Sequence, residues 1–241
     1  MNMPIPAFDR PWHIGAAIAG IVLARLIVSR IPRLGRVRVT LLEFDDSVLM
    51  AVLLVFCLLR PFVLQTFYIP SESMVPTLVK NDRIVALRCW YLFTDPKPND
   101  IVVFRAQTSA YYSNPGMNPD LREQKDFIKR MVGTPGDCLR IDTAPDSTLA
   151  LHRNGERLDE PYIKSDHHNG QWPKDSSHDV VVPEGQYVMM GDNRNNSNDS
   201  KMWLYHAEGS ADVNAPFVPK HALIGKAVCI FWPPDRMRIL H

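Results

Sequence analysis

Two long runs of apolar residues lie near the start of the chain, and short apolar segments separated by turns follow them. The run from Ile14 to Ala24 is unbroken, and its apolar character extends over residues 12–28. The run from Val48 to Leu59 continues past an arginine and a proline to about residue 68. A helix needs roughly 17–25 residues to cross a bilayer. The pattern therefore predicts two membrane helices, at about residues 12–28 and 48–68.

The charges beside these runs predict the orientation of the chain in a membrane. The tail before the first run holds one arginine, whereas the connector of residues 29–47 holds Arg30, Arg33, Arg36 and Arg38. Basic loops stay on the cytoplasmic side. We therefore expect residues 1–69 to form a membrane anchor with a cytoplasmic basic loop, and residues 70–241 to lie on the outer side. A cleaved signal peptide is the alternative for the first run, but it requires a more basic start.

Beyond residue 70, short apolar segments alternate with Gly, Pro and Asn turns. The segments typical of strands are residues 82–87, 99–104, 127–132, 180–190 with a Pro-Glu-Gly turn inside, and 224–231. Asn154-Gly155 between apolar flanks is typical of a hairpin turn. Helical periodicity is almost absent. The fold class predicted is thus mainly β, with two N-terminal transmembrane helices followed by an all-β outer domain that carries a smaller β-rich insertion at about residues 138–180.

Composition narrows the classes of function. A net charge of +1 and a hydrophobic content of 46% argue against a disordered chain and against a strongly basic nucleic-acid binder. His167, His168 and His178 lie in a polar segment without a recognised spacing of metal ligands, and the cysteines show no CxxC motif. We therefore expect no metal, no cofactor and no nucleic-acid partner.

A short segment after the second apolar run carries candidate chemistry. Ser71 and Ser73 are two residues apart, so they face the same side of an extended backbone. Pro70 and Pro76 bracket them and restrict the backbone. A serine hydroxyl becomes a good nucleophile only when a base lies beside it. The alternative interpretation is a Ser/Pro turn that leaves a membrane helix.

Lys129 is the better candidate for such a base. Its neighbours Phe127, Ile128, Met131 and Val132 are apolar. Apolar surroundings disfavour the charged form of a lysine, so its pKa falls and the neutral amine becomes available. Ser-Lys pairs are a known variant of the catalytic triad. A histidine base stays an alternative, because triads are defined by geometry and not by sequence position.

Four segments resemble the sequence boxes of bacterial type I signal peptidases, also called leader peptidases. Their shared feature is that all occur in the order of that family, within about residues 48–232. They are Ile69-Pro-Ser-Glu-Ser-Met-Val-Pro-Thr-Leu78 for the serine box, Asn99-Asp-Ile-Val-Val-Phe104 with Asn in place of Gly, Phe127-Ile-Lys-Arg-Met-Val-Gly-Thr-Pro-Gly-Asp137 for the lysine box, and Gly191-Asp-Asn-Arg-Asn-Asn-Ser-Asn-Asp-Ser200. One such box is weak evidence, whereas four in order are highly specific.

The resemblance implies a role for each matching residue. Ser73 would be the nucleophile and Lys129 the general base. The backbone N–H of Ser73 and the hydroxyl of Ser71 would form the oxyanion hole, and Ser197 would orient the lysine amine. Met74 would pack beside the nucleophile. The residues implied to support the last box structurally are Asp192, Asn193, Arg194 and Asp199.

Two positions depart from the family pattern. Asn195 stands where the family usually has Asp, and Lys201 stands where it often has Arg. If Asp199 pairs with residue 201, a lysine gives one contact where an arginine gives a fork. We expect reduced rigidity of this box rather than lost activity.

The implied reaction is the removal of N-terminal signal peptides from exported preproteins by a membrane-bound serine endopeptidase, after an Ala-x-Ala-like site. The implied partners are preprotein signal peptides, the lipid bilayer and the secretion machinery. The implied location is the bacterial cytoplasmic membrane, with several membrane passes and the catalytic domain on the periplasmic side. No cofactor is implied.

Three other functions deserve comparison. A penicillin-binding protein places its lysine three residues after the serine. Here that position is Pro76, so this function is excluded. A specialised maturation peptidase of the same superfamily would share the serine and lysine boxes. A non-catalytic, membrane-anchored relative that binds signal segments is disfavoured by the intact Ser71, Ser73, Lys129 and Ser197.

Overall fold

The computed structural model divides the chain into two compact units, Met1–Leu64 and Gln65–His241. The residues that it describes are 11–30, 35–55, 63–105, 125–143, 149–164, 171–173, 179–207 and 216–240.

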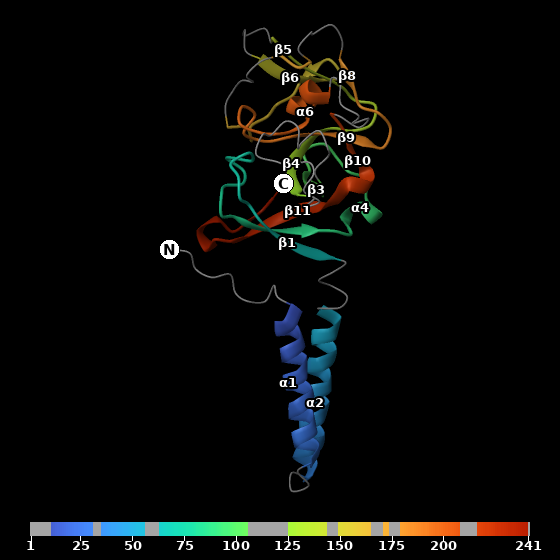
Figure 1. Cartoon of the computed structure of the whole chain (residues 1–241), viewed down its shortest axis with the longest axis vertical. Helices are drawn as coiled ribbons and strands as arrows, with labels where there is room; N and C mark the ends of the chain where they lie inside the picture. The colour runs from blue at the N-terminus through green and yellow to red at the C-terminus, as the bar shows by residue number, and fades with distance from the viewer. Residues whose placement is uncertain are drawn as a thin grey trace. The chain divides into compact units, whose positions relative to one another are not determined.

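The first unit consists of two helices. Helix α1 spans Pro11–Arg30, and helix α2 spans Gly35–Leu53 (Figure 1). An ion pair between Arg25 and Asp46 joins the two helices. No helix among the residues described here is both long enough and apolar enough to cross a membrane.

The predicted bounds of the second helix were wrong. Helix α2 begins inside the stretch 29–47 that was expected to be a loop. Residues 56–62, in the middle of the predicted helix at 48–68, lie outside the described residues. Residues Leu64–Tyr68, at the end of that predicted helix, instead form strand β1, in which burial alternates from residue to residue. A continuous apolar run has no periodicity that separates a strand from a helix, and the length of this run favoured a helix over its whole extent.

The second unit is built on a large sheet, which confirms the mainly β fold class. The strand order is β1-β2-β11-β3-β4-β9-β10, and β12 pairs with β11 (Figure 1). Strand β11 is the longest and pairs antiparallel with β2, β3 and β12. The strands are β1 (Leu64–Tyr68), β2 (Arg83–Leu87), β3 (Ile101–Arg105), β4 (Asp126–Gly133), β9 (Gln186–Met190), β10 (Val218–Pro219), β11 (Leu223–Trp232) and β12 (Arg238–Ile239).

A second, smaller sheet lies within the stretch expected to form the β-rich insertion. It has the order β7-β6-β5-β8, and Figure 1 places it at the opposite end of this unit from β1. Its strands are β5 (Cys138–Thr143), β6 (Leu149–Arg153), β7 (Glu156–Arg157) and β8 (Val180–Val181). The hairpin turn at Asn154-Gly155 joins β6 to β7, as its sequence predicted, and both turn residues have positive φ.

The segment 180–190 connects the two sheets. It is strand, turn and strand, as expected, but β8 pairs with β5 in the small sheet whereas β9 pairs with β4 in the large one. Gly185 has φ of 68° in the turn between them, a conformation that glycine adopts without strain. At this turn the chain therefore passes from the small sheet to the large sheet, and β8 and β9 do not pair as a hairpin.

Helices in the second unit are short and were not predicted. They are α4 (Trp90–Phe93), α6 (Ser200–Ala207), η4 (Lys220–Ala222) and η5 (Pro234–Arg236). Trp203 of α6 is fully buried and packs edge-on to Phe104 of β3 at 6.2 Å between ring centres. This tertiary contact outweighs the weak local preference of an eight-residue segment.

Candidate active site

The serine segment lies between β1 and β2 and is held by its apolar residues. Met74 and Leu78 are completely buried in the core cluster that also contains Ile84 of β2. The backbone N–H of Leu78 donates to the carbonyl of Met74 at 2.8 Å, which closes one turn after the nucleophile candidate. Ser73 is 8% exposed, and its Oγ lies 3.3 Å from the Oγ of Ser71.

Strand β4 brings Lys129 to this serine. Lys129 lies opposite Val102 of β3, and its Nζ is 2.8 Å from the Oγ of Ser73 and 3.0 Å from the carbonyl oxygen of Ile128. Its exposed fraction is 5%. Burial lowers the pKa of Lys129 to about 8, against the opposing pull of the Asp199 and Asp192 carboxylates. A neutral amine is therefore accessible to Lys129 close to neutral pH.

The last box packs directly against the serine segment. The backbone N–H of Asn193 donates to the carbonyl of Ser73 at 3.0 Å, and its side-chain amide donates to the carbonyl of Glu72 at 3.1 Å. A methyl group on Gly191 would lie 2.3 Å from the carbonyl oxygen of Ser73 and 2.3 Å from the Oγ of Ser197. Only glycine permits this approach of the two segments.

Ser197 lies beside this contact, against Gly191. Its Oγ is buried and makes no hydrogen bond with the described part of the chain. The structure therefore brings Ser197 to the site, while its expected role of orienting the lysine stays a prediction.

Asp192 is the centre of a buried ionic network. Arg130 forks it, with Nε donating to Oδ1 at 2.9 Å and Nη2 donating to Oδ2 at 2.8 Å. The side chains are 3% and 0% exposed. The hydroxyl of Thr77, four residues after Ser73, donates to the same carboxylate at 2.5 Å. Arg130 follows Lys129 directly, so one strand sends successive side chains to the serine and to the last box.

Arg194 and Asp199 support the last box from within. Arg194 donates from Nε to the carbonyl of Gly191 at 3.0 Å and forms an ion pair with Glu160 at 2.7 Å. Asp199 accepts the backbone N–H groups of Gly191 and Lys201. The side chain of Lys201 donates to the carbonyl of Arg194 at 3.1 Å. Lys201, which stands where the family often has Arg, thus stabilises the last box through a hydrogen bond to a backbone oxygen.

Sequence reasoning missed Arg130, Thr77, Glu160 and Tyr162 as parts of this site. A second charge directly after Lys129, in an otherwise apolar strand, was a usable signal for Arg130. Thr77 lies within the serine box, which was a signal for it, whereas Glu160 and Tyr162 carry none in the sequence. Asn99, which replaces a family glycine, has φ of 73°, a left-handed conformation that asparagine tolerates better than other residues with a side chain.

Among the described residues, no three His, Cys, Asp or Glu side chains form a group that could hold a metal ion. Cys89, Cys138 and Cys229 are free thiols. His167, His168 and His178 lie outside the described residues.

A serine hydroxyl beside a buried lysine amine, with the hydroxyl of Ser71 3.3 Å from the serine Oγ, is an arrangement compatible with hydrolases that use a lysine in place of histidine. The comparison with known families agrees with this class. The family model described as signal peptidase, peptidase S26, matches residues 41–232. The chain belongs to this signal peptidase family, and it is therefore a serine endopeptidase.

Several bacterial relatives cover most of the chain. Signal peptidase I of Leptolyngbya laminosa is 36% identical over 74% of this chain and 74% of its own length. Probable signal peptidase I-2 of a Synechocystis strain is 36% identical over 83% of this chain and 78% of its own length. Probable signal peptidase I of Mycobacterium leprae is 32% identical, over the same shares of the two chains.

Proposed function

We propose that this protein removes N-terminal signal peptides from exported preproteins, with Ser73 as the nucleophile and Lys129 as the general base. The observation that carries the proposal is the 2.8 Å separation of Ser73 Oγ from Lys129 Nζ, two groups that are each less than a tenth exposed. A desolvated lysine has the lowered pKa that a base needs. Membership of the signal peptidase family supports the substrate class.

The reaction is acyl transfer in two steps. The neutral amine of Lys129 accepts the hydroxyl proton of Ser73 as Oγ attacks the scissile carbonyl carbon. The resulting ammonium returns this proton to the leaving amine nitrogen as the peptide C–N bond breaks, which leaves an ester on Ser73. Lys129 then takes a proton from water as the water oxygen attacks the ester carbon. The ester C–O bond breaks, the ammonium of Lys129 returns the proton to Ser73 Oγ, and the acyl part leaves as a carboxylic acid.

The oxyanion of the tetrahedral intermediate needs donors that already point at it. We assign this role to the backbone N–H of Ser73 and the hydroxyl of Ser71, whose Oγ lies 3.3 Å from Ser73 Oγ. Removal of one such donor typically costs about 10²–10³ in kcat. Preproteins with small residues at the first and third positions before the cut, the Ala-x-Ala pattern, are the proposed substrates.

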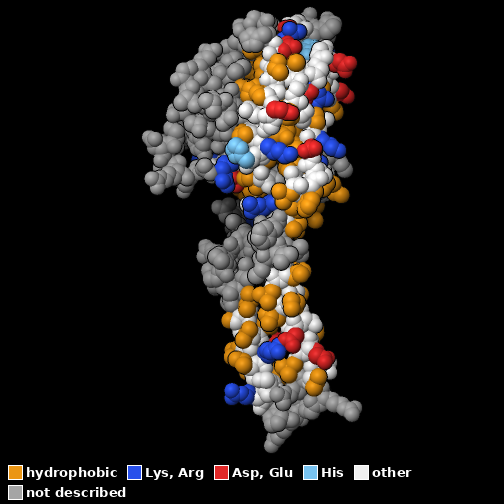
Figure 2. All heavy atoms as spheres, turned by 90° about the vertical axis from the view of Figure 1, so that its right-hand side faces the viewer, with side chains coloured by type: hydrophobic (Ala, Val, Ile, Leu, Met, Phe, Trp, Pro, Cys, Tyr) orange, Lys and Arg blue, Asp and Glu red, His pale blue; other side chains and the backbone are white. Residues whose placement is uncertain are grey.

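The N-terminal unit is the proposed membrane anchor. Large hydrophobic side chains are exposed on α1 and α2, and Figure 2 shows hydrophobic side chains over much of the visible face of this unit. They include Leu23, Leu26, Ile27, Phe44 and Met50. Exposed apolar surface of this kind is stable in lipid rather than in water. The bilayer and the secretion machinery of a bacterial inner membrane are thus proposed partners, with the β unit on the outer side.

Cleavage of a preprotein by detergent-solubilised protein tests the proposal. The wild type is expected to cut after Ala-x-Ala, and Ser73→Ala and Lys129→Ala are expected to be inactive while their melting curves show that they remain folded. Activity that survives in Lys129→Ala would move the base to another residue. A folded but inactive wild type, tried on several preproteins, would favour a specialised maturation peptidase or a non-catalytic binder.

A further inference from the structure

One aromatic ring lies against both arginines that support the candidate site. Tyr162 belongs to the segment that follows β7 of the small sheet. The guanidinium carbon of Arg130 is 3.9 Å from the centre of its ring, and that of Arg194 is 5.9 Å away. Two positive groups on one ring repel each other, so the ring and nearby carboxylates must compensate for their charge.

Glu160, two residues before the tyrosine, supplies part of this compensation. Its carboxylate is 2.7 Å from Nη1 of Arg194, and the two side chains are 6% and 1% exposed. The hydroxyl of Tyr162 lies 3.3 Å from the same carboxylate and 3.3 Å from the side-chain oxygen of Asn99. With Asp192 on Arg130, the cluster holds two positive and two negative groups, which is a balanced charge for a buried site.

These arginines connect the small sheet to the two proposed catalytic residues. Arg130 is the strand neighbour of Lys129 and forks Asp192. Arg194 donates to the carbonyl of Gly191. Gly191 and Asp192 directly precede Asn193, whose N–H holds the carbonyl of Ser73. A displacement of Arg130 therefore reaches Lys129 along the strand and Ser73 through Asp192 and Asn193, and a displacement of Arg194 reaches Ser73 through Gly191.

We propose that Tyr162 and Glu160 are positioning residues, through which the segment that follows β7 of the small sheet holds Lys129 and Ser73 at reacting distance. The inference rests on the proposed roles of Ser73 and Lys129. Neither side chain needs to touch the substrate for this role. A further backbone contact, from the N–H of Lys164 to the carbonyl of Asp192 at 3.0 Å, fastens the same segment to the last box.

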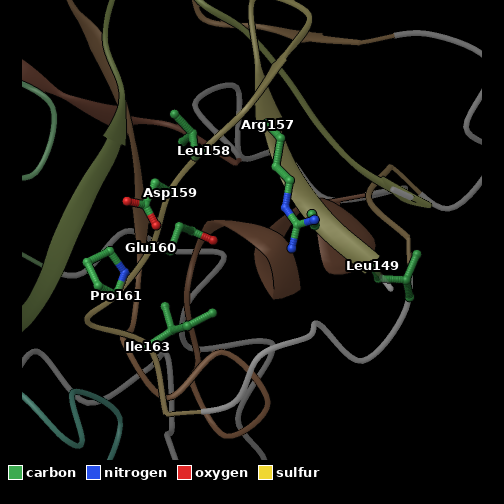
Figure 3. A pocket seen from close by; sticks show the side chains of 8 residues that line it. Leu149, Arg157, Leu158, Asp159, Glu160, Pro161 and Ile163 are labelled. Carbon is green, nitrogen blue, oxygen red and sulfur yellow. The ribbon is translucent and has the colours of Figure 1, made fainter. Parts of the chain in front are cut away.

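Asp159 of the same segment provides a matched control. Residues 157–161 and Ile163 line a surface pocket together with Leu149 and Ala150, with a volume of about 390 Å³ (Figure 3). Asp159 lies in its wall beside Glu160. It is exposed and forms no ion pair or hydrogen bond with the described residues. Asp159→Asn therefore removes a carboxylate from the same segment without touching either arginine.

The tyrosine is tested by two substitutions that separate its ring from its hydroxyl. Tyr162→Leu removes the ring from both arginines, and we expect kcat for preprotein cleavage to fall about 10- to 100-fold while KM changes little. Tyr162→Phe keeps the ring, and its kcat is expected to stay within about threefold of the wild type. Equal losses in the two variants, or an unchanged kcat in Tyr162→Leu, would overturn the role of the ring.

The glutamate is tested against its neighbour. Glu160→Gln is expected to lower kcat about tenfold with KM nearly unchanged, whereas Asp159→Asn retains wild-type kinetics. Melting temperatures measured in parallel identify a variant that is merely unfolded. If Tyr162→Leu does not fold, the comparison of Glu160→Gln with Asp159→Asn tests the proposal. Equal kinetics in the glutamate and aspartate variants would overturn the proposal. Ser73→Ala is assayed beside them, because activity in that variant would refute the proposed reaction itself rather than the positioning role.

Discussion

Lys129 Nζ and Ser73 Oγ are 2.8 Å apart although the two residues are separated by 56 positions in the sequence. The lysine comes from the middle of β4, and the serine comes from the segment between β1 and β2. Both side chains are nearly excluded from water. The contact therefore gives the hydroxyl a partner and places the amine where its positive charge is disfavoured.

The first prediction concerns the pH dependence of cleavage. The reaction needs the neutral amine of Lys129, and burial lowers the pKa of this group to about 8. We expect kcat/KM to rise with pH and to level off above about pH 8, because protonation removes the base in acid. A pH profile with one preprotein substrate measures this limb. An acid limb centred near about 6.5 would instead indicate a histidine base.

The second prediction concerns the stability cost of the buried lysine. The folded-state pKa of about 8 is lower than the ordinary value of 10.5, so the unfolded chain binds more protons between these pH values. The stability of the wild type should thus rise with pH across this window, and the penalty should be constant below it. Lys129→Met removes the charge, and we expect a gain on the order of 3 kcal/mol near pH 7.

Urea denaturation at about pH 7 and about pH 10 checks this prediction. The advantage of Lys129→Met should shrink at the higher pH, where the wild-type lysine is neutral when folded. Ser73→Ala serves as the control, because it disrupts the same pair without removing the titrating group. An advantage of Lys129→Met that is independent of pH would contradict the lowered pKa.

The third prediction concerns the fork between Arg130 and Asp192. Asp192→Asn leaves the buried guanidinium without its charged partner, so we expect a loss of about 3–5 kcal/mol in the free energy of unfolding. Asp95→Asn is the control, since Asp95 pairs with Lys220 at 3.2 Å in an exposed position and should cost less than about 1 kcal/mol. Similar losses of unfolding free energy in the two variants would mean that the buried ion pair stabilises the fold no more than the exposed one.

The fourth prediction concerns the backbone of Asn99. Its φ of 73° lies in the left-handed region, where a Cβ atom costs about 1–2 kcal/mol. Asn99→Ala and Asn99→Gly both remove the contact with Tyr162, but only the alanine variant carries the steric cost. We expect Asn99→Ala to be the less stable of the two in urea. Equal stabilities would exclude backbone strain as the reason for a glycine or asparagine at this position.

Local sequence patterns predicted several strands and turns, but they did not predict which distant segments pair. The strand at 127–132, the turn at Asn154-Gly155 and the mainly β class follow from local patterns, and the structure contains them. The second apolar run was different. Its end at Leu64–Tyr68 forms a strand because it pairs with β2, and no local pattern reports such a partner.

The amino-acid sequence specifies which groups are present: two serines on an extended segment, a lysine among apolar neighbours, and four boxes in a fixed order. Which of these groups meet depends on how the folded chain packs. Arg130 and Asp192 are 62 positions apart, and β8 and β9 separate into different sheets at a single turn. The lowered pKa of Lys129 also depends on burial by distant segments. Such contacts arise from packing between residues that are remote in the chain, so local propensity does not predict them.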